Sequence, residues 1–185
     1  MRPMPGRCLC LGAADAATPL LLVLLAARLS GWFNPLTNAL SDLGHATRSP
    51  VAPIFNLGLS LGGFLLALSG VLCAYRRSRL VGATLVASGF LLNLVGVFDE
   101  VYGRLHYYVS VAFFLSLAAL LVEYSAVARG RLRRVLGLMA LAAGALPWLL
   151  HMVYGLPRGA AVPELVSTLV SLPFYLDFLA GADRT

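Results

Sequence analysis

The stretch that decides the fold is VAPIFNLGLSLGGFLLALSGVLCAYRRSRLVGATLVASGFLLNLVGVFDE, residues 51–100. It holds two apolar segments, about 51–75 and 80–99, separated by the basic turn Arg76-Arg77-Ser78-Arg79. Each segment is long enough to cross a bilayer as a helix, which takes about 20 apolar residues. The stretch therefore predicts two transmembrane helices that run in opposite directions, with a basic turn at the membrane surface.

Four more apolar segments of similar length extend this pattern over the chain, at about 9–31, 105–128, 134–153 and 163–181. Of the 185 residues, 59% are hydrophobic and 12% are charged, whereas a soluble domain is about a quarter charged. We therefore expect an all-α polytopic membrane protein, a bundle of six transmembrane helices. Residues 1–185 are expected to form a single membrane domain.

The positive charge consists of arginine alone and predicts an orientation. Ten arginines fall on one side of the predicted bundle (Arg2, Arg7, Arg76, Arg77, Arg79, Arg129, Arg131, Arg133, Arg134 and Arg184) and three on the other (Arg48, Arg104 and Arg158). Because basic loops stay in the cytoplasm, both termini are expected to be cytoplasmic, in a plasma-membrane protein. No basic face remains for nucleic acid, so membrane lipids are the expected partners, with a homo-oligomer or a membrane complex as further options.

Small residues follow one face of the second and third segments. The second carries Asn56, Ser60, Gly63, Ala67 and Gly70, and the third carries Gly82, Gly89, Asn93, Gly96 and Glu100, at spacings of three, four and seven. Such stripes let membrane helices approach closely, which predicts helix contacts along both.

Ionisable side chains gather at the predicted outer ends of the segments. Inward-facing ionisable groups in a membrane bundle are by default candidates for a functional site. The histidines His45, His106 and His151 are candidate ligands for zinc or another divalent metal, although no HExxH spacing is present. The candidate catalytic carboxylates are Asp42, Glu100 and Glu164, and the candidate binding residues are Ser41, Asn56, Asn93 and Asp99. Together they predict an outward-facing polar pocket for a metal or a lipid head group, and a hydrolase of a lipid or lipid-linked substrate is one candidate activity.

Other functions remain open at this point. The polar residues can simply mark helix ends that meet water, in a non-enzymatic accessory subunit or lipid-handling scaffold of a membrane complex. A haem between His106 and His151 is a third option. Ser41 is a candidate nucleophile with His45 four residues later, and the alternative is that it closes a turn. Whether the protein is an enzyme is not decided by the sequence.

Three further features need a role. Asp15, Glu123 and Asp177 lie toward the predicted inner side, where pairing with Arg131 or Arg133 is favoured over a proton relay. The cysteines Cys8, Cys10 and Cys73 form no CxxC pair and are expected to be small apolar residues. Leu36, Leu40 and Leu43 predict a short interfacial helix in the first loop, which would direct Ser41, Asp42 and His45 over the mouth of the bundle.

Four motifs carry a resemblance to a known family: NPLTNALSDLG, SPVAPIFNLGLSLGGFLL, GVFDEVYGRLHYYVSVAFFL and VPELVS. They resemble the archaeal and bacterial integral-membrane family catalogued as domain of unknown function 998, from the first span to the sixth. Family members read F-P-E where this chain reads Phe98-Asp99-Glu100. A remoter similarity is to the eukaryotic FRAG/DRAM/SFK six-helix membrane proteins, which implies a role with lipids and the motif positions Ser41, Asp42, Gly44, Glu100 and His106.

Overall fold

The computed structural model describes residues 6–182, and nearly all of the regular structure in them is helical. The elements are α1 (Arg7–Ser30), η1 (Leu40–Gly44), α2 (Ala52–Ser69), η2 (Gly70–Ala74), α3 (Tyr75–Arg77), α4 (Arg79–Val97), η3 (Glu100–Tyr102), α5 (Arg104–Val127), α6 (Arg131–Tyr154) and α7 (Ala161–Ala182). Because α2, η2 and α3 form one continuous span, six helices in the described residues are long and apolar enough to cross a membrane. The prediction of a six-helix membrane bundle is confirmed, and the expected ends differ from these by at most three residues.

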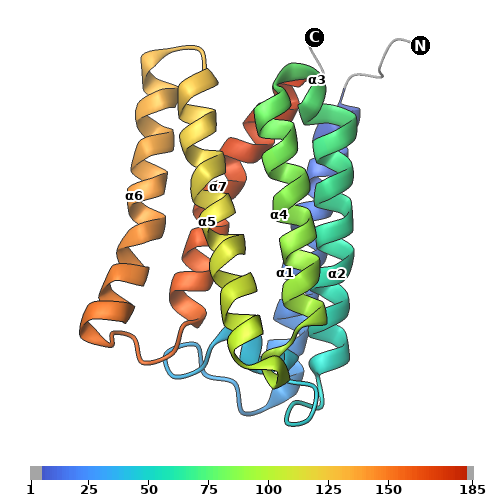
Figure 1. Cartoon of the computed structure of the whole chain (residues 1–185), viewed down its shortest axis with the longest axis vertical. Helices are drawn as coiled ribbons and strands as arrows, with labels where there is room; N and C mark the ends of the chain where they lie inside the picture. The colour runs from blue at the N-terminus through green and yellow to red at the C-terminus, as the bar shows by residue number, and fades with distance from the viewer. Residues whose placement is uncertain (1–5, 183–185) are drawn as a thin grey trace.

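Five of the spans form a ring and the sixth lies outside it. Helices α1, α2, α4, α5 and α7 pack in turn against one another, and α7 closes the ring by contacting α1. Helix α6 packs on α5 and α7, and Figure 1 shows it at the edge of the bundle. This arrangement leaves space both inside the ring and between α5, α6 and α7.

Glycine lets the first helices of the ring approach closely. A Cβ added at Gly58 of α2 would lie 2.7 Å from Leu22 Cβ of α1. Between α2 and α4, one added at Gly70 would lie 2.9 Å from the carbonyl oxygen of Gly82. The predicted small-residue stripes of the second and third spans are therefore the surfaces on which these two helices pack.

The outside of the bundle is apolar, as a lipid-facing surface must be. Large side chains on its surface include Leu21, Phe64, Phe90, Leu115 and Met152, each more than half exposed. The buried core has two parts, one around Phe55 and Phe113 and the other around Leu85, Tyr124 and Leu179. Lipid therefore replaces water as the solvent of most of the outer surface.

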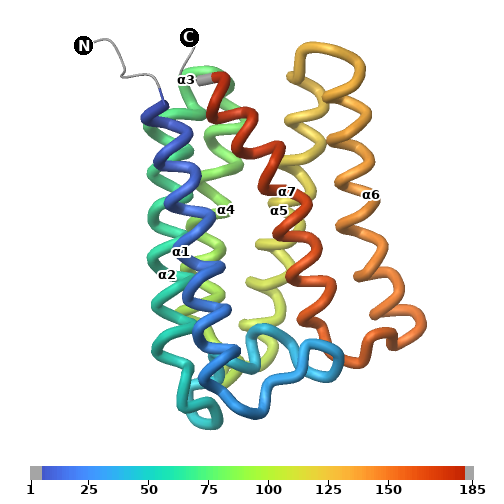
Figure 2. The backbone as a smooth tube through the Cα atoms, turned by 180° about the vertical axis from the view of Figure 1, so that it is seen from behind, coloured from blue at the N-terminus to red at the C-terminus, as the bar shows by residue number. Residues whose placement is uncertain are grey.

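The two ends of the bundle differ. The start of α1, the end of α7 and the arginine-rich turns α3–α4 and α5–α6 lie at one end, at the top of Figures 1 and 2. The long first loop, residues 31–51, crosses the opposite end from α1 to the start of α7 (Figure 2). We call these the arginine end and the loop end. Arg2 and Arg184 lie outside the described residues.

Candidate functional site

The first loop is fixed across the loop end by backbone hydrogen bonds. The amide of Gly159 donates to Leu36 O at 3.0 Å, and the amide of Ala161 donates to Asn38 O at 3.0 Å. Gly159 is required there, because a Cβ at this position would collide with the backbone of Asn38. The loop is thus attached to the segment that starts α7, about 120 residues later in the chain.

The predicted interfacial helix is wrong in its extent. Only Leu40–Gly44 is helical, as one short 3₁₀ turn. Leu43 is fully buried in the core, while Leu36 is 60% exposed and lies outside the helix. The leucines do not share one face because the chain turns at 35–37 and enters the helix only at Leu40. The loop is therefore a packed cap on the bundle and not an amphipathic helix on the membrane surface.

Three carboxylates meet beneath this cap, and we call Asp42, Glu100 and Glu164 the outer acid cluster. Ser41 Oγ donates to Glu100 Oε1 at 2.7 Å, and the amide of Leu40 donates to Glu164 Oε2 at 2.6 Å. Asp42 Oδ2 accepts from the amide of Ala39 at 2.9 Å, which closes the turn. The three acids come from η1, η3 and α7, so the cluster exists only in the folded chain.

Burial and the neighbouring acids both disfavour the ionised form of the carboxyl groups in this cluster. Burial raises the pKa of the Glu100 carboxyl above its ordinary value, and the neighbouring Asp42 raises it further. The hydrogen bond from Ser41 and the charge of His106 act in the opposite direction. Glu164, which is 8% exposed, lies near enough to interact with both other acids. Like charges this close favour a shared proton or a bound cationic group.

The histidines are distributed over the loop end. His106 Nδ1 lies 2.7 Å from Phe98 O and His151 Nδ1 lies 2.8 Å from Pro157 O. Since a carbonyl oxygen only accepts, both rings donate through Nδ1 and keep Nε2 as the second nitrogen. His45 contacts Thr47 at 3.3 Å and lines neither cavity described below. Within residues 6–182, no three His, Cys, Asp or Glu side chains are grouped so as to hold a metal ion. The three-histidine metal site stays a prediction, and its ligands are not brought together.

A cavity of about 690 Å³ lies between α5, α6 and α7, and we call it the lateral groove. Its loop end is polar and is lined by Ser41, Glu100, His106, His151, Glu164 and Ser167. The rest of its wall is apolar and includes Phe114, Leu117, Leu121, Leu141 and Ala145. Its lining side chains Leu115 and Met152 are 65% and 63% exposed, so the groove opens toward the lipid between α5 and α6.

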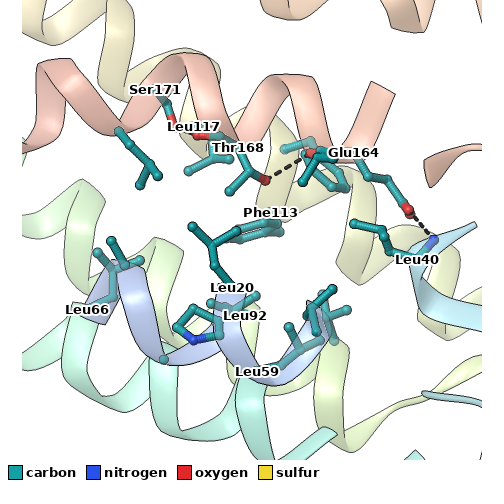
Figure 3. A pocket seen from close by; sticks show the side chains of 18 of the residues that line it. Leu20, Leu40, Leu59, Leu66, Leu92, Phe113, Leu117, Glu164, Thr168 and Ser171 are labelled. Atoms are coloured by element: carbon teal, nitrogen blue, oxygen red, sulfur yellow. Dashed lines mark hydrogen bonds between the residues drawn. The ribbon is translucent and has the colours of Figure 1, made fainter. Parts of the chain in front are cut away.

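A second cavity, of about 130 Å³, lies inside the ring of five helices, and we call it the inner cavity. Figure 3 shows Glu164 and Leu40 at one end of it, with Thr168 and Ser171 following along α7. Ser41 and Glu164 line both cavities. The outer acid cluster therefore stands where the inner cavity and the lateral groove meet.

The structure brings together part of the predicted site. The lateral groove is lined by five of the predicted residues: Ser41, Glu100, His106, His151 and Glu164. Asp42 does not line it but interacts with Glu100.

The remaining predicted binding residues have other contacts and line neither cavity. Asn56 Nδ2 donates to Gly44 O at 2.9 Å, Asn93 Nδ2 donates to Gly89 O at 3.1 Å, and Asp99 Oδ1 caps η3 by accepting from the amide of Val101 at 2.8 Å.

Contacts at the arginine end explain most of its polar residues. Asp177 forms an ion pair with Arg133 at 3.4 Å and accepts from Tyr124 Oη at 2.6 Å. The predicted pairing with a loop arginine is thus confirmed for Asp177. Glu123 accepts from Thr84 Oγ1 at 2.7 Å.

The expectation for the cysteines is wrong at two of the three positions. Cys8 and Cys73 form a disulfide with a Cα–Cα distance of 5.7 Å, and Cys10 is free and exposed. A disulfide depends on how α1 lies against η2, which continues α2, and the linear sequence holds no signal for that register.

A family model described as "Protein of unknown function (DUF998)" matches residues 13–176. The chain belongs to the DUF998 family. The matched region takes in every residue of the outer acid cluster and the walls of both cavities, and it confirms the predicted family. Comparison with curated proteins and with solved structures returned no match. The remoter similarity to the eukaryotic six-helix proteins stays a prediction.

Proposed function

We propose that this DUF998 protein binds a membrane amphiphile in the lateral groove, with the head group at the outer acid cluster. The observation that carries the proposal is the polarity of the groove. Its wall is mostly apolar, and its ionisable side chains lie at the loop end. Its volume of about 690 Å³ falls within the range of about 300–1,000 Å³ that is usual for small-molecule sites.

The lining side chains favour one class of head group. Glu100 and Glu164 accept hydrogen bonds, and His106 and His151 already donate through Nδ1 to backbone carbonyls. No arginine lines the groove, and the chain has no lysine. A phosphate or carboxylate head would meet carboxylates without a counter-charge, whereas an ammonium or a polyhydroxylated head would donate to them. The proposed ligand is therefore an amphiphile with a donor-rich, non-anionic head.

Binding can be tested with three probes that share one alkyl chain: an alkylamine, an alkyl glucoside and an alkyl phosphate. The purified full chain in nanodiscs should bind the first two and bind the phosphate at least tenfold more weakly. Glu164→Gln should weaken binding of the alkylamine by about 10- to 100-fold, because a charge-assisted hydrogen bond contributes about 1.5–3 kcal/mol. Equal affinity for all three probes would refute the assignment of the head group.

The location of the site has its own test. Ala145 of α6 lines the groove, while Ala143 of the same helix is exposed and lines neither cavity. Ala145→Trp should abolish binding of the alkylamine by filling the groove, and Ala143→Trp should leave binding unchanged. If both variants bind like the parent, the site is not in the lateral groove.

A hydrolytic activity is the second candidate, and one contact favours it. Ser41 Oγ donates to Glu100, and His106 stands beside the same carboxylate. A hydroxyl, a carboxyl with a raised pKa and an imidazole in one site are groups suited to general acid–base chemistry on a bound lipid. Release of alcohol or acid from a lipid ester or glycoside by the parent, and its loss in Ser41→Ala and Glu100→Gln, would support hydrolysis. Binding without turnover would favour the lipid-handling scaffold.

The proposal includes an orientation in which the arginine end faces the cytoplasm. The Cys8–Cys73 disulfide lies at this same end, and disulfides are rare in the cytosol, so the orientation needs a direct test. In a Cys10→Ser background, a membrane-impermeant maleimide added to intact cells should label Thr47→Cys in the loop cap. It should leave Arg129→Cys in the α5–α6 turn unlabelled. The reverse labelling would overturn this orientation.

A further inference from the structure

Asp15 is a buried acid that the proposed function does not use. It lies on α1, about 12 Å along the helix axis from Arg7, and only 3% of it is exposed. Its Oδ2 accepts from Ser69 Oγ of α2 at 2.5 Å and from the hydroxyl of Tyr175 of α7. Its Oδ1 has no hydrogen-bond partner and is shielded from the outside. Half of this carboxyl group is therefore unpaired inside the bundle.

No cation stands beside this carboxyl group. The ion pair found within residues 6–182 joins Arg133 to Asp177, and the side chains bonded to Asp15 carry hydroxyls. A lone carboxylate held in a membrane bundle without a counter-charge is strongly disfavoured. The group must hold a proton or a metal cation.

The hydrogen bonds distinguish these two occupants. Ser69 and Tyr175 both donate to Oδ2, so their hydrogens point at Asp15 and away from any cation placed there. A single carboxylate with no second acid supplies too few oxygens for a hard cation, which takes six or more ligands. A protonated acid fits: Oδ2 is then the carbonyl oxygen that accepts two hydroxyls, and Oδ1 carries the hydrogen. The arrangement is that of a neutral carboxylic acid.

The inner cavity connects this acid to the outer acid cluster. Asp15 and Glu164 both line it, at opposite ends. A buried water needs roughly 10–15 Å³ of such space, so about 130 Å³ has room for several waters.

Helix α7 supplies polar groups along the whole length of the cavity. Glu164, Thr168, Ser171 and Tyr175 all line it, and their spacings of four, three and four place them on one face. The row covers about 16 Å. Thr168 Oγ1 donates to Glu164 O at 2.9 Å and Ser171 Oγ donates to Thr168 O at 2.8 Å, so the lone pairs of both hydroxyls remain available to water. Figure 3 shows Glu164, Thr168 and Ser171 in this order beside the cavity.

Beyond Asp15 the path is closed toward the arginine end. The Cys8–Cys73 disulfide and the packed side chains Leu85, Tyr124 and Leu179 fill that part of the bundle. Access to the acid is therefore by way of the inner cavity and not from the arginine end.

We propose that Asp15 is a proton-binding site, loaded from the outer acid cluster through water in the inner cavity along α7. In this exchange the Asp15 side chain turns Oδ1, which is closed off in this structure, toward the inner cavity. Its proton then passes through cavity water to the Glu164 carboxylate and returns by the reverse route. The titratable group that contacts Asp15 is Tyr175, from α7, while α2 contributes the neutral Ser69. The nearest charged group along the path is Glu164 at the far end of the cavity.

Infrared difference spectroscopy tests the site directly on the purified full chain in nanodiscs. The measurements use a Glu100→Gln and Glu164→Gln background, which removes the other acids that can hold a proton. This protein should show the carbonyl band of a protonated carboxylic acid at pH 7, and adding Asp15→Asn should remove the band. Tyr175→Phe removes one donor to the carbonyl oxygen and should shift the band to higher frequency, which keeps the test valid if Asp15→Asn does not fold. A band that survives Asp15→Asn, or that ignores Tyr175→Phe, would overturn the assignment. Loss of the band when sodium chloride replaces choline chloride would show a metal-cation site instead.

The route is tested by the rate at which this band shifts on transfer to heavy water. Replacing Thr168 by Val together with Ser171 by Ala removes two hydroxyls from the path and should slow the shift at least tenfold. Thr18→Val is the matched control, because Thr18 Oγ1 also donates to a carbonyl four residues earlier, at 2.7 Å from Ala14 O, yet lines neither cavity. Equal rates in the parent, the double variant and the control would overturn the path along α7.

Discussion

A close backbone contact between α2 and α4 gives a specific prediction about stability. A Cβ added at Gly89 of α4 would collide with the carbonyl oxygen of Gly63 in α2, and it would lie 2.6 Å from the backbone nitrogen and 3.0 Å from the Cβ of Ala67 in the same helix. Ordinary contact begins at 3.4 Å, so Gly89→Ala must move the two helices apart by at least about 0.8 Å (3.4 Å less the 2.6 Å to the Ala67 nitrogen). Backbone atoms cannot rotate away as a side chain can. A gap of 0.5–1 Å forfeits about a quarter to a half of the dispersion energy of each contact that opens.

The same substitution at another interface is the control. A Cβ added at Gly144 of α6 would meet Val170 Cγ2 of α7 at 3.3 Å, and the other near atoms lie at 3.6 Å or beyond. This methyl group can move by a few tenths of an ångström. Overpacking a close interface costs about 1–3 kcal/mol, so Gly89→Ala should lower the free energy of unfolding by about 2 kcal/mol more than Gly144→Ala.

The assay is reversible unfolding in mixed micelles of mild detergent and dodecyl sulfate, followed by far-ultraviolet circular dichroism. Both variants gain similar helix propensity from the added methyl, so that contribution cancels in the comparison. If Gly89→Ala proves as stable as Gly144→Ala, α2 and α4 do not approach as closely as the structure shows. The small-residue stripes would then not be the surfaces on which α2 and α4 pack.

Three further predictions concern the loop end and the disulfide. Folding raises the pKa of Glu100 above its ordinary value of 4.5. Compared with Glu100→Gln, the parent is therefore most stable below pH 4.5 and loses stability as the pH rises through the raised pKa. Glu100→Gln should therefore gain stability relative to the parent as pH increases, and a pH-independent difference in Tm would contradict this. Gly159→Val should weaken binding of the alkylamine by about tenfold or more by displacing the first loop, and parent-like binding would contradict the attachment of that loop. Cys73→Ser should lower the free energy of unfolding by up to about 4 kcal/mol, since the bond closes a loop of 65 residues, and an unchanged unfolding midpoint would contradict a formed disulfide.

The spans and their packing faces could be predicted because both follow from local chemistry. A long apolar segment in lipid forms a helix, because a helix makes all the hydrogen bonds of its own backbone. The packing faces are visible because glycines repeat at helical spacing, at Gly63, Gly70, Gly82 and Gly89. The gathering of Asp42, Glu100 and Glu164 also follows, because their spans all end at the same membrane surface.

The rest of the site depends on helix register, which spacing does not contain. Asn56 and Asn93 share helix faces with the glycines, and a face that packs on a neighbouring helix has the same sequence pattern as one that lines a pocket. The position of α6 outside the ring, and hence the lateral groove, had no signal in the sequence. The hydrogen bond between Asp15 and Tyr175 joins the first and last spans, 160 residues apart, and it had no signal in the sequence either.

The attachment of the first loop to the start of α7 sets the order in which the protein can mature. A chain is made and inserted from its N-terminus, so residues 34–42 reach the membrane surface when five spans are still to come. The amide of Leu40 donates a hydrogen bond to Glu164, which is made 124 residues later, and the carbonyl of Asn38 accepts one from the equally late Ala161. Until then the amide of Leu40 and the carbonyl of Asn38 lack these partners, and Asp42 and Glu100 have no third acid beside them. Biogenesis of the site is thus completed by the last helix, and a chain truncated before α7 would be inserted but would have no assembled loop end.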